Sequence, residues 1–244
     1  MRQLLIILAI LTTGKVFACG GAYQLRLFPI GMTDNKIILI ETSFHRYSGP
    51  DTSNETTSVR DRWRGTIKLS SLDKKGIYKQ IQLVDSLDFP DFNYISEFKK
   101  SFKKAIASAQ SIHNFVKADK QVIEFCNYKK SCKFLSIKAD TTKNQLRVTT
   151  LDRKNISINF PEEIINESEA IGGISNQHFS INSIRKIKIG DINLTVVDFA
   201  TGEENNTDFI TQTKNQEKCS SPIDCIYPEI VLHHGISFDK IIWE

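Results

Sequence analysis

The sequence predicts a β-rich α+β protein, with antiparallel strands in one or more sheets and one long amphipathic helix, at about residues 91–117, packed on the sheet. Three observations predict this fold. Segments in which apolar and polar residues alternate recur along the chain, separated by turn-forming residues. Residues 91–117 instead repeat apolar side chains at three- and four-residue steps, as a helix does. A Gly-Asp pair at 190–191 separates two alternating segments, which is typical of a β-hairpin.

A small β-propeller-like, all-β fold is the alternative, because the rhythm of strands and turns resembles that of propeller blades. Evenly spaced blade motifs are absent from the sequence, and a long helix in mid-chain does not suit a propeller. The α+β fold is therefore preferred.

Four strands are expected before the helix. A compact apolar run opens the second of them at Lys36, and the polar segment 48–58 that follows contains no core-forming residue. The turn Asp73-Lys74-Lys75-Gly76 separates the third strand from the fourth. The expected strands lie at residues 23–29, 36–47, 63–69 and 78–84.

The helix is the clearest single element, and Asp91 after Pro90 offers an N-cap. Lysines cluster on the side opposite its apolar stripe. A basic helix face of this kind binds an anionic membrane surface, or it is only the solvated side of a helix that covers a sheet. We expect the solvated side, because a helix on a sheet needs its apolar stripe for the core. The stripe comprises Ile95, Phe98, Phe102, Ala105, Ile106, Ala109, Ile112 and Val116, and the basic face Lys99, Lys100, Lys103 and Lys104.

Strands return after the helix. Gly190 suits the first central position of a type II′ turn, because glycine accepts a positive φ there. Residues 161–169 predict a short acidic helix with Pro161 in its first turn. The expected strands lie at residues 146–150, 156–160, 184–189, 192–199, 229–233 and 238–243.

The first residues predict export. Arg2 forms a short positive region, Leu4–Leu11 an apolar run, and Ala18 puts a small side chain before a cleavage point. The apolar run is too short to cross a hydrocarbon core of about 30 Å. We therefore expect a signal peptide at residues 1–18 and a single β-rich globular domain at residues 19–244. Its expected location is the periplasm, the outer membrane or cell surface, or the surrounding medium.

Cys19 is a candidate lipidation site. The segment Val16-Phe17-Ala18-Cys19 resembles a bacterial lipobox, and the resemblance implies that Cys19 becomes a lipidated first residue. Phe17 departs from the pattern, in which a small residue is usual. Lipidation would leave four other cysteines, an even number for an oxidising compartment. The alternative is ordinary cleavage at the same bond, which leaves Cys19 free or paired.

The other four cysteines are disulfide candidates. Cys126 and Cys132 have the same spacing as Cys219 and Cys225, and each pair encloses a polar turn-like segment. We expect each pair to close locally, with the first clipping a hairpin between strands at 122–125 and 133–137. Each bond would contribute about 2 kcal/mol in the chain-entropy account. Crossed pairing between the two loops and a four-cysteine zinc site are the alternatives, although zinc ligands are usually closer in sequence.

No catalytic, cofactor or metal motif is present, so no catalytic residue, cofactor or metal is assigned. His233 and His234 are adjacent, and neighbours on a strand point to opposite faces, so they do not readily share a metal. Trp63 suggests a cation–π or anion site, but alternation interleaves it with the nearby arginines, which favours a buried tryptophan on a half-solvated strand. The five histidines are His45, His113, His178, His233 and His234, the arginines near Trp63 are Arg60, Arg62 and Arg64, and an acidic patch in a predicted loop comprises Asp198, Glu203, Glu204 and Asp208.

The resulting hypothesis is an exported cell-envelope protein with a binding or structural role. The formal charge is +4, and it falls to about +2 when Arg2 and Lys15 leave with the signal peptide, which is too small to indicate a nucleic-acid partner. A protein or glycan partner is expected, and membrane contact only through an anchor at Cys19. The alternative is an exported hydrolase of glycans or peptides whose carboxylates are separated in sequence. A cleft with two facing carboxylates or a histidine dyad would favour the enzyme.

Overall fold

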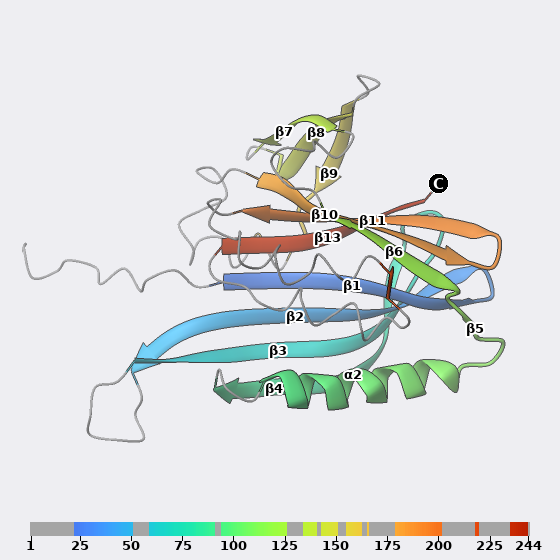
Figure 1. Cartoon of the computed structure of the whole chain (residues 1–244), viewed down its shortest axis with the longest axis horizontal. Helices are drawn as coiled ribbons and strands as arrows, with labels where there is room; N and C mark the ends of the chain where they lie inside the picture. Colours follow the sequence, from blue (N-terminus) through green and yellow to red (C-terminus); the bar gives the residue numbers. More distant parts are fainter. Residues whose placement is uncertain are drawn as a thin grey trace, which may run out of the picture.

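The computed structural model describes residues 22–50, 59–90, 94–125, 134–140, 143–150, 155–162, 165, 179–201, 218–219 and 235–243. It confirms the β-rich α+β fold, with one helix packed on a large sheet (Figure 1). The elements are β1 (Ala22–Thr33), β2 (Lys36–Pro50), β3 (Val59–Leu72), β4 (Tyr78–Pro90), α2 (Tyr94–Gln110), β5 (Val116–Lys117), β6 (Lys120–Phe125), β7 (Phe134–Asp140), β8 (Gln145–Thr150), β9 (Asn155–Asn159), β10 (Phe179–Ile189), β11 (Ile192–Thr201), β12 (Lys218–Cys219) and β13 (Gly235–Trp243).

Ten strands form one sheet. Nine follow the order β12-β6-β10-β11-β13-β1-β2-β3-β4, and β5 pairs with β1 beside this path. The pairings are antiparallel except between β1 and β13, which run parallel over four positions from Ala22 to Leu25. A second sheet has the order β7-β8-β9. The propeller alternative is therefore wrong, because most strands belong to one continuous sheet rather than to separate blades.

Two tight turns follow from backbone conformation. Gly190 has a φ of 56° and Asp191 is not in the positive-φ region, so the β10–β11 turn has its positive φ at the glycine, as predicted. The β1–β2 turn differs, because Asp34 and Asn35 have φ values of 45° and 62°. Positive φ at both central residues is the signature of a type I′ turn, and Asn and Asp tolerate it better than most residues.

Helix α2 ends earlier than the predicted limit near residue 117. The chain leaves the helix after Gln110, Asn114 adopts a φ of 56°, and Val116 pairs with Met32 of β1. Ile112 and Phe115 still pack against the core, which explains why the apolar periodicity continues past the helix. Strand pairing to β1 prevails over helix propensity in this segment.

Three apolar clusters form the core. The first lies between α2 and one face of β1–β4, the second between the small sheet and the neighbouring strands β1, β11 and β13, and the third between β1–β2 and β10, β11 and β13. Residues 37–40, four consecutive aliphatic residues of β2, are at most 1% exposed, because β2 is covered on both faces. The compact apolar run seen in the sequence therefore marks a doubly buried strand.

The expected hairpin between residues 122–125 and 133–137 is wrong. β6 pairs with β10 and β12 in the large sheet, whereas β7 pairs with β8 in the small one. Cys19, Cys126, Cys132 and Cys225 lie outside the described residues, as do the segment 1–18, Asp91, the strand expected at 229–233 and most of the helix expected at 161–169. Within the described segments, no helix has both the length and the apolar character that a membrane span requires.

Candidate functional site

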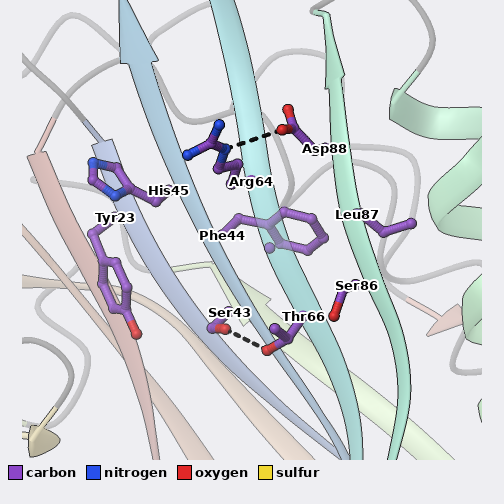
Figure 2. Close-up of a pocket in the computed structure, with 10 residues that line it drawn as sticks. Tyr23, Ser43, Phe44, His45, Arg64, Thr66, Ser86, Leu87 and Asp88 are labelled. Carbon is purple, nitrogen blue, oxygen red and sulfur yellow. Dashed lines mark hydrogen bonds and ion pairs between the residues drawn. The ribbon is translucent and has the colours of Figure 1, made fainter.

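An open groove of about 570 Å³ lies on the face of β1–β4 opposite to α2 (Figure 2). Alternation along β2 separates the two faces. Ile40 and Phe44 pack in the helix cluster, whereas Ser43 and His45 alternate with them and face the groove. On β4, Leu87 packs in the helix cluster and Ser86 and Asp88 face the groove. Phe44 and Leu87 also border the groove, so it has an apolar floor beside its polar rows. The helix and the groove therefore occupy opposite sides of one sheet layer.

The groove is built from two rows of polar side chains that cross the strands. The sheet register places Tyr23, His45, Arg64 and Asp88 next to one another on β1, β2, β3 and β4. The adjacent row contains Ser43, Thr66 and Ser86. Neighbouring strands are about 4.8 Å apart, so each row spans the sheet at nearly contact distance.

Hydrogen bonds link side chains within each row. Arg64 Nε donates to Asp88 Oδ2 at 3.0 Å, and the hydroxyls of Ser43 and Thr66 share a hydrogen bond of 2.8 Å (Figure 2). The Arg64 and Asp88 side chains are 63% and 40% exposed, so water screens their attraction and the pair adds little to stability. The pair leaves a guanidinium and a carboxylate accessible at the surface.

One end of the groove meets the small sheet. Tyr23 is 5% exposed and belongs to the apolar cluster that also contains Phe160 and Phe179. The small sheet covers the large sheet on one side of Tyr23, and the groove opens on the other. A ligand lying across β1–β4 would therefore meet an aromatic border at one end and the exposed Arg64–Asp88 pair at the other.

The register separates His45 from Asp88. His45 and Asp88 lie on either side of β3, two strand spacings or roughly 10 Å apart, which is too far for a dyad. The second carboxylate on this face of the described strands is Glu41, which is 5% exposed and accepts a bond of 3.3 Å from Lys68. Glu41 is two strands across and four residues along from Asp88, or roughly 16 Å, beyond the separation used by paired glycosidase carboxylates.

A second polar cluster is buried inside the sheet. Arg26, Arg185, Asp198 and Asp239, from β1, β10, β11 and β13, are each at most 3% exposed. Arg26 contacts both aspartates, Arg185 pairs with Asp239, and the Ser237 hydroxyl donates to Asp198 at 3.0 Å. The two cations and two anions balance, which is the condition under which buried charge is tolerated. We call these four residues the buried quartet.

The quartet occupies the point where β1 leaves β13. Their parallel pairing stops at Leu25, so the backbone of Leu27 has no ladder partner on β13. Asp239 Oδ2 accepts from Leu27 N at 2.8 Å, and Arg185 Nη2 donates to Leu27 O at 3.1 Å. Charged side chains thus replace the missing strand hydrogen bonds, and the quartet has a structural role.

The prediction of an acidic patch in a loop is wrong for Asp198, which belongs to the buried quartet. Asp198 lies within β11 and is fully buried, whereas Glu203, Glu204 and Asp208 lie outside the described residues.

The other candidate residues are scattered. His113 is exposed after α2, where its carbonyl accepts from Thr33 Oγ1 at 2.7 Å, and Cys219 in β12 pairs with Gln121 of β6. Arg60, Arg62 and Trp63 lie in β3, but their side chains are outside the described part. The whole of His178, His233 and His234 is likewise outside it.

Sequence reasoning named His45 and Arg64 without joining them to each other or to Asp88. Their proximity depends on the β2–β3–β4 register, and β4 carries two irregularities that shift its pairing with β3. The available signal was the alternation that puts His45 and Ser43 on the face opposite Phe44.

Comparison with known proteins finds no matching family model, no similar curated protein and no similar solved structure. Among the residues that the structure describes, no three His, Cys, Asp or Glu side chains gather closely enough to share a metal ion. The groove is therefore the feature from which a function is inferred.

Proposed function

We propose that this protein is an exported cell-envelope protein that binds a polar, extended ligand across the open face of β1–β4. The observation that carries the proposal is the row of His45, Arg64 and Asp88 on a solvent-open face of the sheet. Three clusters of the sheet bury apolar side chains against a helix, a second sheet or other strands, and the outer strand β4 also exposes Ile81 and Leu83. The polar groove interrupts that coverage.

The side chains indicate the ligand chemistry. A guanidinium presents donors in a planar fork that suits a carboxylate or phosphate oxygen pair, and Arg64 is 63% exposed at the groove surface. Hydroxyls of the second row donate to and accept from hydroxyl or amide groups. A glycan or a peptide that carries an acidic group has both features, so it is the proposed ligand class.

A hydrolase is the weaker interpretation of this site. Hydrolysis by two carboxylates needs them on either side of one bond, and hydrolysis by a nucleophile needs a base within hydrogen-bond reach. The separation of Asp88 from Glu41 is too large for the first mechanism, and the separation of His45 from Asp88 is too large for a dyad of these two residues. Binding needs only the accessible polar rows.

The test is binding with a matched variant. Protein purified after expression of the full chain would be screened on arrays of acidic and neutral glycans and peptides, and hits would be titrated by calorimetry. We expect an acidic ligand whose affinity falls about tenfold or more in Arg64→Gln, the loss of one charge-assisted hydrogen bond. Lys188→Gln, an exposed substitution on β10, is the control and should leave affinity unchanged.

Two outcomes would refute the proposal. Ligands that bind with equal affinity to the parent protein and to Arg64→Gln would place binding away from the groove. Release of a smaller product from a bound glycan or peptide would establish the hydrolase instead.

A further inference from the structure

We propose that the solvent face of α2 binds an anionic lipid surface by charge alone. This contact adds to any lipid anchor at Cys19 and does not depend on the ligand proposed for the groove. Helix α2 lies along the outside of the molecule, over β2, β3 and β4 (Figure 1).

The basic face is a concentrated positive charge. Lys99, Lys100, Lys103 and Lys104 are all exposed, and the five helical steps from residue 99 to residue 104 span only about 7.5 Å along the axis. Lysines four residues apart repel each other and weaken the helix slightly. Within this cluster, Asp85 of β4 contacts Lys104 at 3.3 Å and offsets part of the charge. Glu97 in the first turn is the acidic residue of the described helix itself.

The apolar face of α2 is already committed to the core. Phe98, Phe102, Ala105 and Ala109 are at most 1% exposed, and the ring of Phe102 packs edge-on against Phe28 with centroids 5.3 Å apart. A membrane-inserting helix must place such a face among the lipid acyl chains. Because α2 cannot do so while the protein is folded, its contact with a bilayer has to remain at the level of the headgroups.

Charge complementarity selects the partner. Four or more lysines on one helix face suit a surface with spread negative charge, such as a bilayer that contains anionic lipids. Lysine is a compact point charge without the planar fork of arginine, so it suits a diffuse field better than bidentate recognition of one group. A polynucleotide is disfavoured because the chain as a whole carries a formal charge of only +4.

The test is co-sedimentation with vesicles. All proteins would carry Cys19→Ser in the full chain, so that no acyl chain contributes to binding. Vesicles of phosphatidylcholine alone would be compared with vesicles that contain about one-third phosphatidylglycerol. The test variant is Lys99→Gln/Lys100→Gln/Lys103→Gln, which spares the Lys104–Asp85 contact. The control, Lys186→Gln/Lys188→Gln/Lys240→Gln, removes the same charge from exposed positions on β10 and β13.

We expect the parent protein and the control to bind only the anionic vesicles. The test variant should partition on the order of 100-fold more weakly, at roughly fivefold per lysine. Raising the salt concentration to about 1 M, where the Debye length is near 3 Å, should abolish binding by the parent protein. Circular dichroism would check that each variant remains folded.

Three outcomes would overturn the inference. Equal losses in the test and control variants would show an effect of net charge rather than of α2. Binding that survives high salt would show insertion by another segment. Binding to an acidic protein or polynucleotide but not to anionic vesicles would assign the basic face to a different polyanion.

Discussion

Removal of one charge from the buried quartet should destabilise the protein strongly, and removal of both charges of one pair should cost less than the sum of the two single changes. Arg185→Met leaves Arg26 facing two buried aspartates and takes the donor from Leu27 O. Asp239→Asn leaves two buried arginines with Asp198 alone, although the amide oxygen can still accept from Leu27 N. Each single change therefore creates an excess charge in a site that is at most 3% exposed.

The expected cost of each single substitution is about 3–5 kcal/mol, as for other broken buried ion pairs. That is a large share of a typical unfolding free energy of about 5–15 kcal/mol. The double variant Arg185→Met/Asp239→Asn restores balance, with Arg26 against Asp198. It should cost on the order of 2 kcal/mol less than the sum of the two single variants.

Urea unfolding followed by circular dichroism gives these free energies. The exposed pair Arg64–Asp88 is the control, because Arg64→Met and Asp88→Asn should each cost less than about 1 kcal/mol. Single quartet variants that cost as little as this control, or a double variant whose cost is additive, would refute the structural role of the quartet.

Three further predictions follow from the structure. The hydroxyl of Ser101 and, secondarily, the ammonium of Lys104 lower the pKa of Asp85 below its usual value. The ionised carboxylate therefore stabilises the folded state above the unfolded pKa, and this stabilisation is lost as pH falls through the lower folded pKa. Asp85→Asn should be slightly less stable than the parent protein at pH 7 and equally stable in strong acid, as measured by urea unfolding at both pH values. Gly31→Ala should cost about 1–3 kcal/mol and lower the melting temperature more than Gly190→Ala, because a Cβ at residue 31 would clash with the Val116 carbonyl and the Phe115 ring. Residue 190 has open space around it and only its φ of 56° disfavours alanine. Equal shifts would mean that β1 and β5 separate easily. Intact mass and peptide mapping without reduction should give an acylated chain that begins at Cys19, with local bonds in each loop. An unacylated chain with one reactive thiol would instead support ordinary cleavage before Cys19.

The strands before the helix were predictable because their patterns are local. The apolar run at 37–40 indicates a strand buried on both faces. Gly190 likewise indicates the β10–β11 turn, because glycine accepts the positive φ that the turn requires. The end of α2 was not predictable, since Ile112 and Phe115 continue the apolar periodicity although the chain has turned toward β1. The local sequence pattern shows which side chains are buried, but it does not show whether the backbone at those residues is still helical.

The polar sites required long-range information. Aspartate is common in loops, so the sequence around Asp198 predicts a loop. Only the pairing of β11 with β13 brings Asp198 to Arg26, which lies far away in the chain. The groove likewise depends on β2, β3 and β4 keeping one register over His45, Arg64 and Asp88. A one-residue slip would move His45 to the helix side, so no local pattern could have joined these three residues.

The arrangement of the two proposed surfaces has a consequence for binding. The groove and the basic face of α2 lie on opposite sides of the β2–β4 layer, so a bilayer held by α2 would leave the groove facing away from the membrane. No residue of the groove lies on α2, and the layer between them is packed with side chains that are nearly all buried. If this packed layer keeps one arrangement, neither ligand has a second state to select, and the two binding free energies should be independent. Vesicle affinity should therefore be the same with and without a saturating groove ligand, and a change of fivefold or more, the lower end of allosteric coupling, would show that the sheet layer has two states.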